Sequence, residues 1–247
     1  MFPIRDHNPS GRTPYVTYAL IALNVVIFLS YWPIMDDPRA LYVFYDTWAM
    51  VPVQIYQAAE YQTLVTSMFL HAGWLHLAGN MLFLWIFGDN MEDEMGHLGF
   101  LLLYLAAGVA AAGAHLLSAP YSQVPTVGAS GAIAGVMGGY LLLFPKARID
   151  ILLFLVIFIR IFTLPAWAVL CIWFGIQIVG GAAADPGTGG VAYWAHAGGF
   201  VAGILLTLPL FLKLGGPRFW NRTHGHPPHP ETRYRYVRTS VPKVSRR

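Results

Sequence analysis

The sequence predicts an all-α fold, a polytopic membrane protein built as a bundle of six transmembrane helices. The first observation is composition: 56% of the residues are hydrophobic and only 11% are charged, whereas charged residues make up about 25% of a typical soluble domain. The second is that residues 95–145 contain no Asp, Glu, Lys or Arg. Because about 20 apolar residues cross the hydrocarbon core of a bilayer, this stretch can hold two crossings around the polar, proline-containing loop 118–126.

The third observation is that apolar segments of similar length recur along the rest of the chain. We expect the first span to be retained, because no signal-peptide cleavage pattern accompanies it. The apolar run 151–164 is interrupted by Arg160, so we interpret it as interfacial or as the approach to the fifth span. The six predicted spans are residues 15–32, 73–88, 98–117, 128–143, 165–181 and 192–212.

The distribution of basic residues orients this bundle. With six spans, all of the 15 Lys and Arg residues except Arg39 fall on one face, which the positive-inside rule makes cytoplasmic. Membrane topology thus explains the basic pI, and we expect no nucleic-acid partner. The chain divides into a cytoplasmic N-terminal segment (1–14), a membrane domain (15–214) and a basic tail (215–247), which we expect to be disordered and able to contact anionic lipid.

Four polar residues are expected at one depth in the membrane. Spans two, four and six all run from the outside to the inside, and each carries polar side chains near its start: His76 and Asn80, Ser130, and His196. Polar groups within a bilayer are unfavourable unless they face a partner or a water-filled cavity. Their agreement in depth predicts a hydrated pocket that opens to the outer side.

Small residues predict that spans four and six lie in contact. A small residue at every fourth position lets two helix backbones approach closely in lipid. If the two stripes face each other in parallel, Ser130 and His196 are each one residue from the pair Gly131–Ala195. The stripes are Gly131, Gly135 and Gly139 on span four, and Ala195, Gly199 and Gly203 on span six.

A serine beside a histidine is typical of nucleophilic catalysis, because the imidazole removes the proton that makes the hydroxyl a weak nucleophile. The tetrahedral intermediate then needs hydrogen-bond donors. His76 and Asn80 lie four residues apart and so share a helix face, and together with the backbone N–H of Ser130 they are candidates for an oxyanion site. Gly128 and Gly131 would let a substrate backbone come close.

Three motifs make the chain resemble the rhomboid family of intramembrane serine proteases: HAGWLHLAGN at residues 71–80, GASGA at 128–132 and AHAGG at 195–199. The resemblance covers roughly residues 1–214. It implies a catalytic dyad of Ser130 and His196, oxyanion donors from His76 and Asn80, and a structural role for His71. It also implies single-span or other transmembrane proteins as substrates, a lipid bilayer as surroundings and a bacterial inner membrane as location, with no metal and no cofactor.

The chain departs from the family pattern at several positions. Some members carry an aromatic residue that stacks on the catalytic histidine, where this chain has Ala134. What orients His196 is therefore open, and Asp185 in an outer loop is a weak candidate. Some members have Trp-Arg in the first outer loop, here the long, aromatic-rich stretch 33–63, where this chain has Tyr61-Gln62.

Three alternatives remain. A non-catalytic relative on the same scaffold would bind membrane-protein clients, but such relatives lack the serine or the histidine. A metalloprotease could bring His71, His76 and His196 together, although no HExxH motif is present. A transporter or channel would be expected to show acidic residues in mid-span. Gln177 and His115 we interpret as interhelical hydrogen bonds or loop-facing groups.

Overall fold

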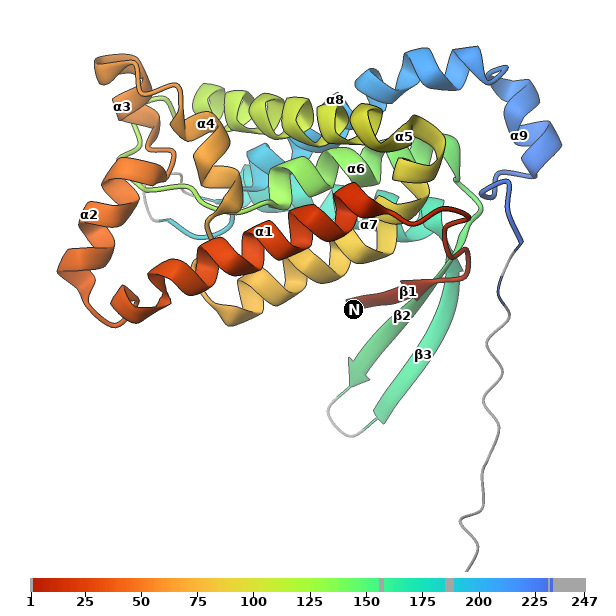
Figure 1. Cartoon of the computed structure of the whole chain (residues 1–247), viewed down its shortest axis with the longest axis horizontal. Coiled ribbons are helices and arrows are strands. Elements are labelled where there is room, and N and C mark those ends of the chain that lie inside the picture. The colour runs from red at the N-terminus through yellow and green to blue at the C-terminus, as the bar shows by residue number, and fades with distance from the viewer. Residues whose placement is uncertain (1, 156–157, 185–188, 231, 233–247) are drawn as a thin grey trace, which may run out of the picture.

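The computed structural model describes residues 2–155, 158–184, 189–230 and 232. Figure 1 shows an elongated bundle of helices, with short helices at one end and a small sheet and helix α9 at the other. The elements are β1 (Phe2–Asp6), α1 (Tyr15–Tyr31), η1 (Trp32–Ile34), α2 (Pro38–Trp48), α3 (Pro52–Ala58), α4 (Thr63–Thr66), η2 (Ser67–Phe69), α5 (Trp74–Ser118), α6 (Ser130–Leu143), β2 (Arg148–Leu155), β3 (Phe158–Pro165), α7 (Ala166–Ala183), α8 (Tyr193–Lys213) and α9 (Pro217–Thr223).

Four helices in the described part of the chain are long and apolar enough to cross a membrane: α1, α5, α7 and α8. Helix α5 runs for 45 residues, but Gly96 within it has φ 71° and ψ 165°, so two helices meet there. These two helices cover the predicted spans 73–88 and 98–117. Helix α6 is also apolar but has only 14 residues. The chain is therefore a polytopic membrane protein, and the count of six crossings stays a prediction.

Helix α6 forms the centre of the bundle. It packs against α5 and α8, and all its residues except Ser130, Leu141 and Leu142 are buried. Glycines make this possible, because a Cβ at Gly203 of α8 would overlap the carbonyl oxygen of Gly135 on α6. In lipid, such close backbone contact stabilises helix association where apolar side chains alone give little preference.

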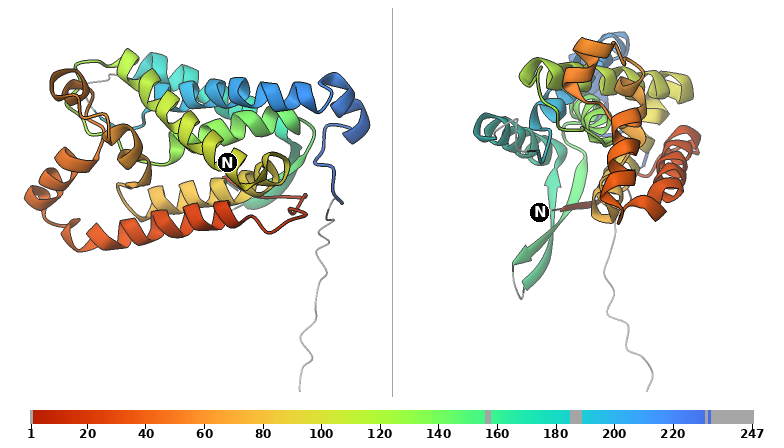
Figure 2. Two further views of the ribbon diagram at one scale, coloured as in Figure 1. Left: turned by 45° about the horizontal axis from the view of Figure 1, so that its top comes forward. Right: turned by 90° about the vertical axis from the view of Figure 1, so that its left-hand side faces the viewer.

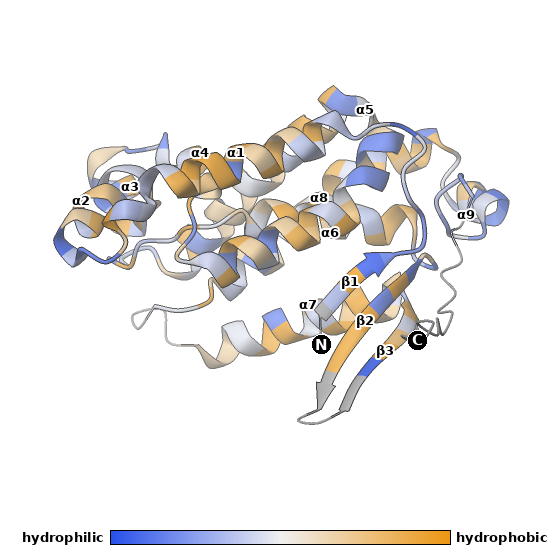
Figure 3. Ribbon diagram, turned by 60° about the horizontal axis from the view of Figure 1, so that its bottom comes forward, coloured by the Kyte–Doolittle hydropathy of each residue, from blue (hydrophilic) through white to orange (hydrophobic). Residues whose placement is uncertain are grey.

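The run 151–164, interpreted as interfacial or as the approach to the fifth span, contributes to an antiparallel hairpin of β2 and β3. Strand β1 adds to it, giving the order β1-β2-β3, with Arg5 opposite Asp150 and Asp150 opposite Thr163. Figure 3 shows the hairpin as largely hydrophobic. The all-α prediction therefore omitted a sheet, because a short apolar run rich in Ile and Phe fits a strand as well as a helix.

Part of the tail predicted as disordered, residues 215–247, is ordered. Pro217–Thr223 form α9, in which Phe219 is buried and the indole Nε1 of Trp220 donates to the carbonyl of Leu142 at 2.9 Å. Aromatic burial thus outweighs the polar composition of this stretch. Residues 231 and 233–247 of the predicted tail lie outside the described residues.

The aromatic-rich stretch 33–63 folds into short helices beside the bundle. Figure 2 shows α2 and α3 at the end of the molecule remote from α9. Several of their side chains are exposed, among them Tyr42, Trp48 and Tyr56. Tyr and Trp favour the boundary between lipid and water, so these helices are suited to that boundary.

Candidate active site

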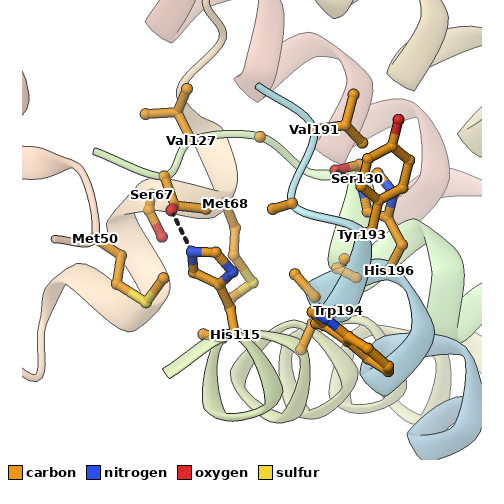
Figure 4. Close-up of a pocket in the computed structure, with 18 of the residues that line it drawn as sticks. Met50, Ser67, Met68, His115, Val127, Ser130, Val191, Tyr193, Trp194 and His196 are labelled. Carbon is orange, nitrogen blue, oxygen red and sulfur yellow. Dashed lines mark hydrogen bonds between the residues drawn. The ribbon is translucent and has the colours of Figure 1, made fainter. Parts of the chain in front are cut away.

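A cavity of about 640 Å³ opens near the ends of α5, α6 and α8. Most of its wall is apolar, and a few polar groups converge on it, which is typical of a site that binds a specific ligand. Its described lining residues include no acidic or basic side chain apart from three histidines, His76, His115 and His196. Figure 4 shows Ser130 and His196 side by side on its wall.

Ser130 and His196 are in direct contact. Ser130 is the first residue of α6 and His196 is the fourth of α8. The Nε2 of His196 lies 2.7 Å from the Oγ of Ser130, within the range of a hydrogen bond that involves a hydroxyl. Both side chains are half-buried, so they are shielded by the bundle while remaining on the cavity wall.

The glycine contact explains why these two side chains meet. The predicted register of the two small-residue stripes is confirmed: a Cβ at Gly131 would lie 3.8 Å from the carbonyl oxygen of Ala195, and one at Gly135 would lie 3.1 Å from that of Gly199. Because the backbones touch along this line, the side chains of Ser130 and His196 beside it are held at bonding distance.

His76 presents a hydrogen-bond donor near Ser130. The backbone N–H of Ala72 points at Nδ1 of His76 at 3.3 Å, so Nδ1 is an acceptor and the proton of the neutral ring lies on Nε2. A Cβ at Gly128, which has φ 128°, would lie 2.8 Å from this Nε2 and 3.6 Å from the Oγ of Ser130. Glycine at position 128 therefore permits both the positive φ and the close passage of the histidine ring.

Asn80 supplies a second donor on the same helix face. Its side chain is buried, it lines the cavity, and its Nδ2 has no hydrogen-bond partner among the described residues. The N–H of Ser130 lies in the first turn of α6, where helix N–H groups have no partner within the helix. Buried donors are nearly always paired in folded proteins, so an unpaired one on a cavity wall is free for a ligand.

His71 lies behind this face and is fully buried. Its ring centroid is 5.1 Å from that of His76. Its backbone N–H donates to the hydroxyl of Tyr31 at 2.6 Å, and that hydroxyl donates to the carbonyl of His71 at 2.7 Å. The backbone of His71 thus anchors the segment before α5 to α1, whereas its ring nitrogens have no hydrogen-bond partner among the described residues, so the role of the side chain stays a prediction.

Gln177, expected to make an interhelical hydrogen bond or to face a loop, does bond to another helix, although its place beside His196 was not predicted. Its Oε1 lies 2.8 Å from Nδ1 of His196, and the Trp173 ring lies 5.9 Å from the His196 ring, centroid to centroid. Ala134 is buried in α6 and carries no ring, while Asp185 lies outside the described residues. The sequence did contain an indication of this position. The predicted fifth span runs from the inside to the outside, and Gln177 lies near its outer end, at the depth of the other polar residues.

His115 lies elsewhere on the cavity wall. Its Nε2 lies 3.0 Å from the Oγ1 of Thr126, in the loop between α5 and α6, so the expected role as an interhelical or loop-facing group is borne out. Within the residues that the structure describes, no group of three or more His, Cys, Asp or Glu side chains is arranged to hold a metal ion.

The sequence of this chain is similar to those of several known proteins. The rhomboid domain profile matches residues 58–213. "Rhomboid protein 1, mitochondrial" of Saccharomyces cerevisiae is 30% identical over 203 residues, which are 77% of this chain and 51% of that protein. "Rhomboid-like protein 11, chloroplastic" of Arabidopsis thaliana is 47% identical over 53% of this chain and 43% of its own length. "Rhomboid protease GluP" of Bacillus subtilis is 36% identical over 52% of this chain and 24% of its own length.

This chain thus spans about half, or less, of the length of these relatives. The profile match covers more than half of the chain and includes all three motifs around Ser130, His196 and the pair His76 and Asn80. The chain belongs to the rhomboid family.

Proposed function

We propose that this protein is an intramembrane serine endopeptidase that cleaves transmembrane segments of membrane proteins near the outer face of the membrane. The observation that carries the proposal is the 2.7 Å contact between Ser130 Oγ and His196 Nε2 on a cavity wall. A serine protease of the dyad type needs this pair and donors for the oxyanion.

The reaction follows from the positions of these groups. Nε2 of His196 takes the hydroxyl proton as Oγ of Ser130 attacks the substrate carbonyl carbon. The carbonyl oxygen becomes an oxyanion, which Nε2–H of His76, Nδ2 of Asn80 and the N–H of Ser130 stabilise. When the C–N bond breaks, the imidazolium returns its proton to the leaving amine, and an acyl group remains on Ser130. Water, deprotonated by His196, then attacks the acyl carbon, and the imidazolium returns that proton to Oγ of Ser130 as the acyl–oxygen bond breaks and the carboxylic acid product is released.

The setting of the cavity supports a membrane-embedded substrate. Helices flank it and glycines 128 and 131 border Ser130, so an extended peptide backbone can come close. A substrate helix hides its carbonyl groups in internal hydrogen bonds, so small or helix-breaking residues at the cleavage site should favour attack. Its substrates are single-span or other transmembrane proteins.

The location follows from the charge pattern. The basic residues that flank the spans place both termini in the cytoplasm, and the cavity then opens to the opposite, outer side. We propose a bacterial inner membrane as the location, which the charge pattern alone does not distinguish from other membranes. The binding of membrane-protein clients without cleavage is the alternative, and the experiment below separates the two.

The test is cleavage of a model transmembrane substrate in proteoliposomes, together with labelling by a fluorophosphonate. Wild-type protein should cleave and be labelled, whereas Ser130→Ala and His196→Ala should lose cleavage by at least about 10³-fold. Ser30→Ala, which removes an exposed hydroxyl on α1 bonded only to its own helix, is the matched control and should keep full activity. Full cleavage by a folded Ser130→Ala protein would disprove the proposal, and substrate binding without cleavage by the wild type would favour the client-binding alternative.

A further inference from the structure

His196 is held from two sides. Its Nε2 faces Ser130 at 2.7 Å and its Nδ1 faces Oε1 of Gln177 at 2.8 Å. Gln177 is buried in α7, and His196 is half-buried in α8. The imidazole therefore bridges two helices through both of its nitrogens.

The orientation of the Gln177 amide follows from a third contact. Its Nε2 donates to the backbone carbonyl of Trp173, one turn earlier in α7, at 3.2 Å. Since a carbonyl only accepts hydrogen bonds, the NH₂ group must lie on that side and Oε1 must face His196. An amide oxygen only accepts as well, so Nδ1 of His196 must carry the ring proton.

This proton decides what the other nitrogen can do. A neutral imidazole has one N–H, so with the proton on Nδ1 the lone pair lies on Nε2, toward Ser130. Only that tautomer can accept the hydroxyl proton. With the proton on Nε2, the same two atoms would remain close together but the ring could not act as a base.

We propose that Gln177 is a positioning residue that takes the place of the acid in a catalytic triad, selecting the base-competent tautomer of His196 through an uncharged hydrogen bond. The inference rests on the proposed function. A neutral partner suits this site, because the described lining of the cavity carries no acidic side chain and an ionised carboxylate within a bilayer is strongly unfavourable. The Trp173 ring beside the imidazole limits its rotation, so the amide and the ring constrain it together.

The first test observes the tautomer itself. Nitrogen-15 NMR of histidine-labelled protein in detergent distinguishes Nδ1–H from Nε2–H without any need for activity. Wild-type His196, identified by its loss in His196→Ala, should be protonated on Nδ1. Gln177→Met, which keeps the length of the side chain and removes the amide, should convert a large part of it to the Nε2–H form. A wild-type ring protonated on Nε2, or an unchanged tautomer in the Met variant, would overturn the proposal.

The second test uses kinetics. Gln177→Met should lower kcat by about 10- to 100-fold, the effect of losing one buried hydrogen bond at the reacting group, while KM stays within about twofold of the wild-type value because Gln177 does not line the cavity. Gln177→Glu keeps an acceptor oxygen for Nδ1 of His196 and should be more active than Gln177→Met. Burial favours the neutral carboxyl, and the fraction that ionises beside the imidazole should move the acid limb of the kcat/KM profile to higher pH. Gln57→Leu, an equivalent loss of an amide on α3, is the control and should change neither quantity.

These outcomes separate a positioning role from a structural one. If Gln177 only packs α7 against α8, the Met and Glu variants will lose activity in proportion to thermal stability and show no shift of the pH profile. Ser130→Ala measured in parallel separates the two proposals. Cleavage that persists without Ser130 refutes the protease assignment, whereas cleavage that needs Ser130 but is unchanged in Gln177→Met refutes only the role of Gln177.

Discussion

The two ends of the helix bundle differ in the charge of the polar residues that they bury. At the cavity end the polar side chains are uncharged types, and one donor, Nδ2 of Asn80, has no described partner. At the other end, Asp150 alone accepts from Arg5 at 2.7 Å, from Thr163 at 2.6 Å and contacts His7 at 2.8 Å. Buried polar groups that are fully paired hold a fold together, whereas an unpaired donor on a cavity wall is available to a ligand.

Glu92 is a well-paired carboxylate at the charged end. Its two carboxylate oxygens accept the backbone N–H groups of Val16 and Thr17 at 2.9 and 2.8 Å, and the hydroxyl of Thr17 at 2.7 Å. These N–H groups lie in the first turn of α1, which lacks a side-chain cap of its own. A residue from α5 therefore caps α1 across the bundle, at a place where the helix dipole favours negative charge.

In the comparison of the two ends, the largest expected effect would come from removing the unpaired donor of Asn80. Asn80→Ala should lower kcat by roughly 10²- to 10³-fold, the usual effect of losing one oxyanion donor, and leave the thermal stability close to that of the wild type, since Nδ2 has no described partner to lose. Steady-state cleavage in proteoliposomes and a melting curve in detergent measure the two quantities.

A second buried asparagine provides the matched control. Nδ2 of Asn24 in α1 donates to the carbonyl of Leu20 at 2.7 Å, so Asn24→Ala should lower stability and leave the turnover of folded protein unchanged. The contrast between the two ends fails if Asn80→Ala loses stability and keeps its kcat.

An intermediate effect is expected at Glu92. Glu92→Gln keeps the shape but places an NH₂ group against backbone donors, which should lower the free energy of unfolding by about 1–3 kcal/mol. Turnover per folded molecule should stay the same, because the change lies at the end remote from the cavity. Chemical denaturation in detergent measures the first quantity, with Glu60→Gln in a loop as the control; an unaltered unfolding midpoint for Glu92→Gln would show that the cap contributes little.

The last expected effect is a pH dependence set by Asp6. Burial, and then the nearby Asp89, raise the pKa of Asp6 to about 8, while the hydroxyl of Tyr140 and Nδ2 of Asn90 donate to its Oδ2 at 3.2 and 2.7 Å. The folded protein therefore holds a proton that the unfolded chain releases near pH 4. The contribution of Asp6 to stability is complete below that pH and falls as pH rises toward 8.

Asp6→Asn mimics the protonated acid at every pH. Between pH 5 and pH 8 the melting temperature of the variant should fall by several degrees less than that of the wild type. Melting curves in detergent at each pH measure this difference. Asp150 gives the opposite sign: burial acts to raise its pKa, but the hydrogen bonds from Thr163, His7 and Arg5 outweigh it and hold the pKa of Asp150 below its usual value. Parallel pH curves for the wild type and Asp6→Asn would refute the assignment of this dependence to Asp6.

The cavity end was more predictable from the sequence than the charged end, and the reason is physical. Ser130 and His196 are polar residues in apolar spans beside glycine stripes, so depth and packing together predict that they meet. The hairpin of β2 and β3 was missed because an apolar run of this length lacks a distinctive period. Gln177 was expected to make an interhelical hydrogen bond, but its partner His196 was not predicted, because the comparison of depth used only helices that run in one direction and this bond joins two antiparallel helices.

The pairing of β1 with β2 has a consequence for the order of assembly. Phe2 lies opposite Leu152, so β1 cannot pair with β2 until the long segment between these two residues has been synthesised. Contacts between such distant positions form slowly, because a long loop must close first. The helices that are synthesised earlier can pack before the sheet forms. The sheet then joins β1 to the segment that leads into α7.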